Sequence, residues 1–187
     1  ANNIKNIALA GHSNSGKTSL AEALLYLTGA VDRLGKTADG NTVCDFDSEE
    51  IKRQVSVATA IAPLEWKGEK INLLDTPGLF DFEGGVSEGI RAAGCVIITI
   101  SGKSGVAVGS EKAFDAAMKR NIAKVFFVNK IDSESADFYK VFESLKTQFG
   151  PAVCPIVVPY VVDHKVQCYI NMLEYKAYAY QNGKVTE

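Results

Sequence analysis

The segment from Gly11 to Thr18 constrains this chain more than any other, because it reads G-H-S-N-S-G-K-T and matches the pattern G-x-x-x-x-G-K-[ST]. The run before it, residues 4–10, is short and apolar like a strand. The residues after it, 17–28, carry leucine and alanine at helical spacing. Glycines at both ends allow a tight turn between such a strand and helix. The pattern therefore predicts a strand, an anion-binding loop and a helix in succession.

Apolar, strand-like runs alternate with helix-like segments through the first 158 residues. Two of these runs, 94–101 and 124–129, are nearly unbroken, as in strands that are buried on both faces of a parallel sheet. The order predicts a doubly wound, mostly parallel α/β sheet between helical layers, the three-layer fold of P-loop NTPases. The predicted strands are residues 4–10, 57–64, 70–75, 94–101, 124–129 and 153–158, and the helices include 17–28, 110–120 and 136–149.

The last part of the chain, residues 159–187, has a different pattern. Valine, tyrosine and lysine alternate there without a helical segment between them. This predicts a small antiparallel appendage. We therefore expect a first domain over residues 1–158 and an appended subdomain over 159–187.

Composition excludes several classes of partner. The formal net charge is −2 and no basic stripe is present, so we expect no DNA partner. The longest apolar runs are too short to cross a bilayer, and the N-terminal residues lack the apolar stretch of a signal peptide. The four cysteines form no C-x-x-C pair, which is typical of reduced thiols in the cytosol. We expect a cytoplasmic monomer.

The glycine-rich loop predicts a phosphate site. Backbone N–H groups from Asn14 to Thr18 would point into one cavity, and the positive end of the following helix would face it. Lys17 can reach the β- and γ-phosphates of a nucleotide, and the Thr18 hydroxyl can ligate Mg²⁺. The residues predicted to hold the phosphates are Gly11, Asn14, Ser15, Gly16, Lys17, Thr18 and Ser19.

A second motif, Asp75-Thr76-Pro77-Gly78, follows the predicted strand 70–75. An aspartate in this place holds Mg²⁺ in P-loop proteins, often through water. Gly78 has no side chain, so its N–H can approach a γ-phosphate. We therefore assign Lys17 and Gly78 to catalysis. The predicted metal residues are Thr18, Asp75 and Ser56, with Thr59 and Thr42 as weaker alternatives to Ser56.

A third motif, Asn129-Lys130-Ile131-Asp132, follows the apolar strand 124–129. The Asp132 carboxylate can accept hydrogen bonds from N1–H and the 2-amino group of guanine, whereas adenine offers neither donor. Lys130 can lie along the plane of the base, and Asn129 can bond its edge and the phosphate loop. The three residues predict a site for GTP and GDP.

These motifs resemble those of translational GTPases, and most of all elongation factor G. The similar segments are GHSNSGKT, DTPGLFDF, GVAVGSEKAF and VFFVNKID, and the likeness runs through essentially the whole chain. The resemblance implies GTP hydrolysis triggered on the ribosome and coupled to translocation. It also implies that residues 159–187 begin an antiparallel insertion, and that the chain is an N-terminal fragment of a longer protein.

Three positions depart from the family pattern. The family has a histidine after D-T-P-G that positions the attacking water, and this chain has Leu79. The family aspartate of the phosphate loop is Asn14 here. The family segment R-G-I-T appears as Arg53-Gln54-Val55-Ser56, so Gln54 replaces a glycine. The histidines at 12 and 164 do not replace the missing one: we expect a structural role for His12 and a surface position for His164.

These departures predict a divergent paralogue with slow or differently triggered hydrolysis, because positioning supplies much of the catalysis of phosphoryl transfer. The first hypothesis is a ribosome-associated GTPase of the elongation factor G type. The second is a GTP/GDP switch that hydrolyses little. The third is another translational GTPase, of the release-factor or ribosomal-protection type.

Overall fold

The computed structural model describes residues 4–163, 165–181 and 184–187. The chain forms two compact units. The first contains residues up to 101 together with 107–129, and the second contains the loop 102–106 and all residues from 130 onward. The predicted division at residues 158 and 159 stays a prediction.

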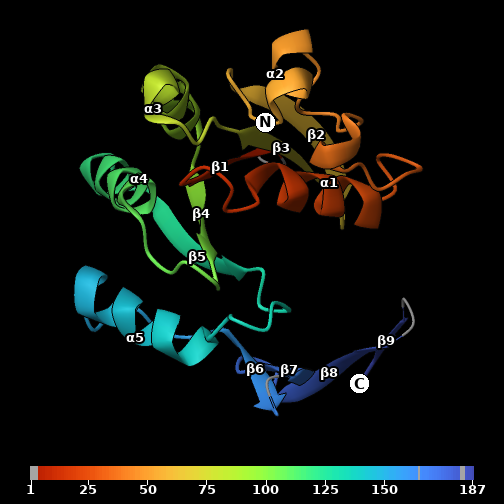
Figure 1. Cartoon of the computed structure of the whole chain (residues 1–187), viewed down its shortest axis with the longest axis vertical. Coiled ribbons are helices and arrows are strands. Elements are labelled where there is room, and N and C mark those ends of the chain that lie inside the picture. The colour runs from red at the N-terminus through yellow and green to blue at the C-terminus, as the bar shows by residue number, and fades with distance from the viewer. Residues whose placement is uncertain (1–3, 164, 182–183) are drawn as a thin grey trace. The chain divides into compact units, whose positions relative to one another are not determined.

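The first unit is built on a five-stranded sheet in the order β2-β3-β1-β4-β5 (Figure 1). Strand β1 pairs in parallel with both β3 and β4, β5 continues the parallel pairing, and β2 joins β3 as an antiparallel hairpin at the edge. The strands are β1 (Ile4–Gly11), β2 (Ala60–Trp66), β3 (Glu69–Asp75), β4 (Cys95–Ser101) and β5 (Ala123–Asn129). The sheet is thus mostly parallel, as the sequence predicts.

Helices cover both faces of this sheet. Helix α1 packs against β1, β2 and β3, while α3 and α4 pack against each other and against β1 on the other side (Figure 1). The helical elements are α1 (Lys17–Leu27), η1 (Thr37–Asp39), α2 (Ser48–Arg53), η2 (Phe80–Phe82), α3 (Glu83–Ala92) and α4 (Val108–Lys119). The first unit therefore has the three layers of a doubly wound α/β fold.

The buried faces follow from strand geometry. Successive side chains of β1 point to opposite faces of the sheet, so Leu9 faces one layer while Ala8 and Ala10 face the other. Leu9 lies in one core cluster with Ala21 and Leu25 of α1. The small side chains of Ala8 and Ala10 are fully buried. This central strand carries the phosphate loop at its carboxyl end, so the loop starts from the most enclosed part of the sheet.

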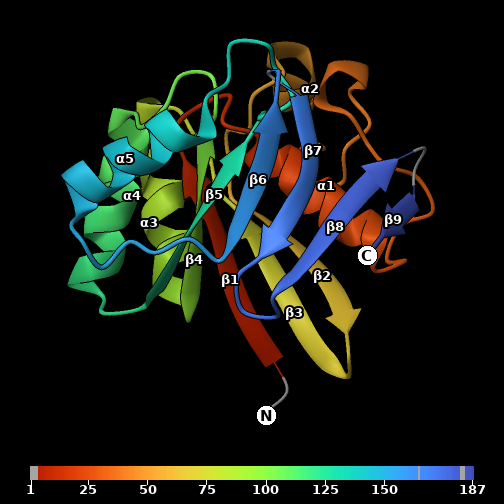
Figure 2. The ribbon, with the colours of Figure 1, turned by 90° about the horizontal axis from the view of Figure 1, so that it is seen from below.

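The second unit contains α5 (Phe138–Phe149) and a four-stranded antiparallel sheet, whose alternating strand directions are visible in Figure 2. Its strands are β6 (Val157–Val162), β7 (Lys165–Asn171), β8 (Lys176–Gln181) and β9 (Lys184–Thr186). The sequence prediction of a strand over 153–158 that extends the parallel sheet is wrong. The strand begins at Val157 and pairs with β7 in a hairpin, where Pro159, which lacks an N–H, occupies an edge strand.

The described residues hold no helix with the length and apolar character that crossing a bilayer requires.

Candidate functional site

The phosphate loop joins β1 to α1 as the motif predicts. Gly11 has a φ of 138° and Gly16 a φ of 95°, values that L side chains rarely adopt. A Cβ on Gly11 would lie 2.6 Å from the carbonyl oxygen of Thr99, and one on Gly16 would collide with the Asn129 amide. Asn14 is also left-handed, at a φ of 59°, which asparagine tolerates better than most residues. The turn therefore depends on the residue types of the motif.

A neighbouring strand supports this loop through Thr99, a residue that sequence reasoning missed. Its buried hydroxyl lies 2.5 Å from the Ser15 hydroxyl and donates to the carbonyl oxygen of Ala10. No local signal marks Thr99, because its strand is simply apolar.

Ser19, predicted to contact the nucleotide, is exposed on the first turn of α1.

Lys17 lies in the middle of the candidate site and is only 6% exposed. Its Nζ donates to the carbonyl oxygens of Gly11, at 3.3 Å, and His12, at 3.1 Å. Burial lowers the pKa of Lys17, and the negative charges of Asp75 and Asp45 oppose that change. A buried ammonium at the start of a helix is a strong attractor for phosphate.

The three predicted metal residues come together from three distant segments. The Thr18 hydroxyl donates to Asp75 Oδ2 at 2.7 Å, and Thr18 Oγ1 lies 3.3 Å from Ser56 Oγ. All three side chains are buried. The alternatives to Ser56 have other partners: the Thr42 hydroxyl accepts from the Asp45 N–H, and Thr59 donates to the carbonyl oxygen of Gly85.

Asp45 joins this cluster, although no motif in the sequence marks it. Ser56 Oγ donates to Asp45 Oδ1 at 2.6 Å, and Asp45 is 4% exposed. Burial raises the pKa of Asp45, while the Ser56 hydrogen bond opposes the rise. Burial also raises the pKa of Asp75 to about 7, against the hydrogen bond from Thr18 and the charge of Lys17.

The cluster fits a Mg²⁺ ion. Asp75 Oδ1 and Asp45 Oδ2 are both buried and have no hydrogen-bond partner among the residues that the structure describes. Buried carboxylate oxygens in that condition are costly unless a cation or donor meets them. Two hydroxyls and two carboxylates form the hard oxygen set that Mg²⁺ prefers.

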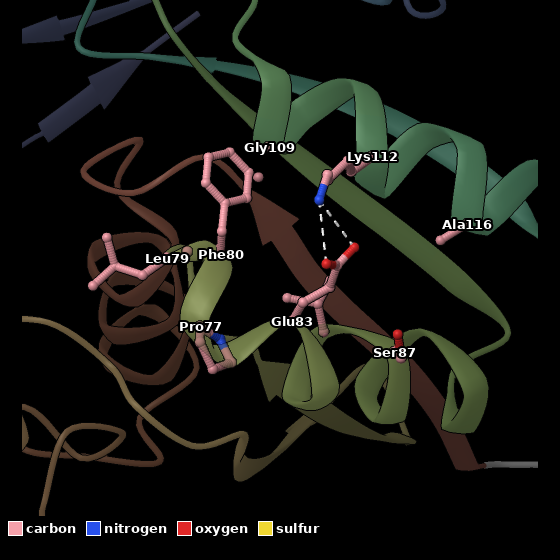
Figure 3. Close-up of a pocket in the computed structure, with 11 residues that line it drawn as sticks. Pro77, Leu79, Phe80, Glu83, Ser87, Gly109, Lys112 and Ala116 are labelled. Atoms are coloured by element: carbon pink, nitrogen blue, oxygen red, sulfur yellow. Dashed lines mark hydrogen bonds and ion pairs between the residues drawn. The ribbon is translucent and has the colours of Figure 1, made fainter.

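The segment after Asp75 lies directly against the phosphate loop. A Cβ on Gly78 would be 2.5 Å from Lys17 Nζ and 2.7 Å from Ser13 Cα, so only glycine fits this approach. Leu79 caps η2 and is 38% exposed. Figure 3 shows the Leu79 side chain pointing away from Lys112 and Glu83.

A small cavity lies beside this segment, between α3 and α4 (Figure 3). Its volume of about 40 Å³ admits water and is far too small for a nucleotide. Lys112 at its edge pairs with Glu83 at 3.2 Å and lies 4.9 Å from the centroid of the Phe80 ring. These contacts link the start of α3 to α4.

The His12 ring packs near Phe80, at 5.8 Å between ring centroids. Its Nδ1 is buried and has no hydrogen-bond partner within the described part of the chain. The His12 carbonyl accepts from Lys17, and a structural role of the His12 side chain stays a prediction. The other histidine, His164, lies outside the described residues.

The base-reading motif starts at the end of β5. Asn129 Nδ2 donates to the carbonyl oxygen of Ser15 at 3.1 Å, which is the tie to the phosphate loop that the sequence predicts. Lys130 and Asp132 belong to the second unit. The pKa of Tyr169, in the same unit, is raised mainly by burial and to a smaller extent by the negative charge of Asp132. Recognition of guanine by Lys130 and Asp132 stays a prediction.

Comparisons with known proteins give a consistent result. The family model described as the elongation factor Tu GTP binding domain matches residues 2–186. Elongation factor G of Granulibacter bethesdensis is 33% identical over 182 residues, and an elongation factor G-like protein of Mycobacterium tuberculosis is 34% identical over 183. These alignments cover 97% and 98% of this chain but 26% and 25% of the relatives.

A crystal structure of a protein from Thermus thermophilus superimposes on the whole chain with a TM-score of 0.93 at 37% identity, and the match covers 28% of that protein. The chain therefore spans about a quarter of the length of the proteins that it matches. Sequence, fold and motif order all agree with the family model. The chain belongs to the translational GTPases, as an elongation factor Tu-type GTP-binding domain like that of elongation factor G.

Proposed function

We propose that this chain binds GTP and GDP together with Mg²⁺ and hydrolyses GTP. The observation that carries the proposal is the meeting of Thr18, Ser56 and Asp75 beside Lys17. Thr18 comes from the phosphate loop and Asp75 from the end of β3. Ser56 comes from the segment 28–59 between α1 and β2, which contains η1 and α2 and is called the loop before β2 below. Only a ligand that combines phosphates with a divalent cation uses all of these groups at once.

Each residue would have a distinct role. The N–H groups of residues 14–18 and the Lys17 ammonium would neutralise the β- and γ-phosphates. Thr18 and Ser56 would offer hydroxyl oxygens to Mg²⁺, and Asp75 and Asp45 would hold the metal directly or through water. Held by these residues, Mg²⁺ would supply positive charge that offsets the negative charge developing during phosphoryl transfer.

Base recognition completes the proposal. Asn129, the first residue of the base-reading motif, is tied to Ser15 of the phosphate loop. Asp132 would select guanine over adenine, and Lys130 would cover the face of the base. Gly78 would sense the γ-phosphate, because its backbone already lies against Lys17 and Ser13.

One observation favours the second function, a nucleotide switch with little hydrolysis. Leu79 stands after the D-T-P-G motif, and a leucine side chain has no polar group with which to orient water. Positioning of the nucleophile can contribute orders of magnitude to the rate. We therefore expect slow hydrolysis by the chain alone.

The whole protein would act in translation elongation. We propose the ribosome as its partner, translocation as the coupled event, the cytoplasm as its location and a monomer as its state. The elongation factor G relatives support the ribosome and translation roles. A release-factor or ribosomal-protection role is the alternative within the same family, and the parts of those relatives that this chain does not match would decide it.

Binding is tested first, with fluorescent GTP, GDP and ATP analogues in the presence of Mg²⁺. We expect GTP and GDP to bind and ATP to fail, with Asp132→Asn weakening the guanine nucleotides. Single-turnover hydrolysis with and without ribosomes then separates the functions. Faster hydrolysis in the presence of ribosomes would support the GTPase function. Tight GTP binding with hydrolysis at the background rate, both with and without ribosomes, would support only the nucleotide switch.

A further inference from the structure

Two buried carboxylates outside the candidate nucleotide site hold the loop before β2. Glu22 is 1% exposed and Glu50 is 2% exposed. Neither forms a salt bridge with a described residue. A buried charge is strongly unfavourable unless hydrogen bonds compensate it. Here the compensating donors are backbone N–H groups of the loop, so each carboxylate fixes the course of the chain.

Glu50 binds the loop on both sides of the metal cluster. Its Oε2 accepts from the N–H of Asp47 at 3.2 Å. Its Oε1 accepts from the N–H groups of Val57, at 3.0 Å, and Ala58, at 3.3 Å. Asp47 comes two residues after Asp45, and Val57 directly follows Ser56. One side chain therefore fixes the two backbone segments that carry Asp45 and Ser56.

Glu22 anchors the same loop to α1. It lies one turn after Thr18, and its Oε1 and Oε2 accept from the N–H groups of Val43, at 2.5 Å, and Gly35, at 3.2 Å. A Cβ on Gly35 would collide with the Glu22 carboxylate and lie 2.9 Å from the carbonyl oxygen of Asn41. The loop is therefore held close to the helix that presents Thr18.

We propose that Glu50 is a positioning residue of the magnesium site. Its carboxylate accepts hydrogen bonds from the backbone on either side of the cluster, and in this way it holds Ser56 and Asp45 beside Thr18 and Asp75. This inference rests on the proposed function, because it concerns the metal that accompanies the nucleotide. Replacing a residue that orients metal ligands without binding the metal itself typically lowers metal affinity or activity by about 10- to 100-fold.

The test measures Mg²⁺ dependence rather than turnover. In the whole protein, Glu50→Gln is compared with Glu49→Gln, a matched change on the same helix, where Glu49 is exposed and pairs with Arg53. Retention of a fluorescent GTP analogue is followed as Mg²⁺ is titrated, and again in EDTA. We expect Glu50→Gln to raise the half-saturating Mg²⁺ concentration about tenfold. Binding in EDTA and the Glu49→Gln titration should match the wild type.

Two further measurements keep the test decisive. A cycle of Glu50→Gln with Ser56→Ala should show effects on Mg²⁺ that are not additive, because Glu50 acts through Ser56. Trypsin should cut the nucleotide-free Glu50→Gln protein faster at Arg53 and Lys52 than the control. Glu50→Asp retains the charge on a shorter side chain and serves as the second variant if Glu50→Gln does not fold.

The outcomes separate the two proposals. If the wild type binds no guanine nucleotide, the proposed function fails and the positioning role fails with it. If the wild type binds, but the Mg²⁺ titration of Glu50→Gln equals that of the control, only the positioning role fails. Equal weakening with Mg²⁺ and in EDTA would also overturn it, since a purely structural anchor would act in that way.

Discussion

The phosphate loop and the loop before β2 face the same candidate ligand but are held in different ways. The phosphate loop takes its turn from its own residues, with glycine at both ends and Asn14 in a left-handed conformation, while Thr99 and Asn129 support it from outside. The loop before β2 takes its shape from Glu22 and Glu50, which accept hydrogen bonds from its backbone. A turn set mainly by its own residue types should tolerate changes elsewhere, whereas a loop held by two buried carboxylates depends on them.

The largest effect is expected in the phosphate loop, from Lys17→Ala. Loss of a buried ammonium that would meet two phosphates should weaken GTP binding by about 3 kcal/mol, or roughly 100-fold. The unfolding free energy should change little, because the ammonium is desolvated and, among the described residues, donates only to carbonyl oxygens. Fluorescent GTP titration measures the affinity. Lys36→Ala, on the exposed surface of the other loop, is the control, and an equal loss in both variants would contradict the assignment.

The next largest effect is expected from Glu22→Gln on α1, which would loosen the loop before β2. The amide presents a donor where the carboxylate accepted, so one of two hydrogen bonds to charge is lost. We expect the free energy of unfolding to fall by about 2 kcal/mol and trypsin to cut faster at Arg33 and Lys36. Chemical denaturation and timed proteolysis measure these effects. Unchanged proteolysis would mean that the loop does not depend on Glu22.

The buried carboxyl groups of the metal cluster, Asp75 and Asp45, should make the stability of the protein depend on pH. Folded Asp75 keeps its proton up to a pKa of about 7, whereas the unfolded chain loses it near the ordinary aspartate value of 3.8. The folded state binds more protons between these values, so the unfolding free energy of the metal-free protein should fall as pH rises. The slope that this carboxyl contributes is at most about 1.4 kcal/mol per pH unit.

Asp45, whose pKa is also raised, adds to this slope in the same direction. Urea denaturation at several pH values, without metal or nucleotide, measures it. Asp75→Asn should flatten the dependence, and saturating Mg²⁺ with GDP should reverse it, because the bound metal favours the charged carboxylates. A slope that Asp75→Asn leaves unchanged would assign the pH dependence to other groups.

The smallest effect is expected from Gln54→Gly. Gln54 ends α2 with a φ of 55°, a left-handed conformation that glycine adopts without strain. We expect the change to raise the unfolding free energy by less than about 1 kcal/mol. Lys52→Gly, within the helical part of α2, should instead lower it by about 1 kcal/mol. Thermal unfolding of both variants measures the difference, and a destabilising Gln54→Gly would show that the strain is absent.

The two sheets also differ in how well their sequences predict them. All five strands of the mostly parallel sheet lie within a few residues of their predicted bounds, and three of them, β1, β3 and β5, end in motif residues. The predicted sixth strand instead pairs locally with β7. Pattern alone identifies an extended segment but not its partner, because a hairpin neighbour competes with distant strands.

Some missed features had a signal in the sequence and others had none. Helix α2 opens with Asp47-Ser48-Glu49-Glu50, in which Asp47 and Glu50 form a capping box. The spacing of Asp47 and Glu50 is present in the sequence, but the polar residues around them show no helical periodicity. Asp45 had no such signal. An acidic residue in a polar loop is usually solvated, and only its burial beside Ser56 reveals a role.

The sequence by itself determined the phosphate loop, the five strands of the first sheet and the family. Consecutive residues fix the direction of consecutive N–H groups, so spacing is enough for such features. Only the tertiary structure decided that Asp45 joins Asp75 near Thr18, and which carboxylates hold the loop that carries Ser56. Glu22, Asp45 and Glu50 are simply acidic residues in the sequence. Their different roles come from burial and from the donors that folding brings to each, and neither is encoded in local spacing.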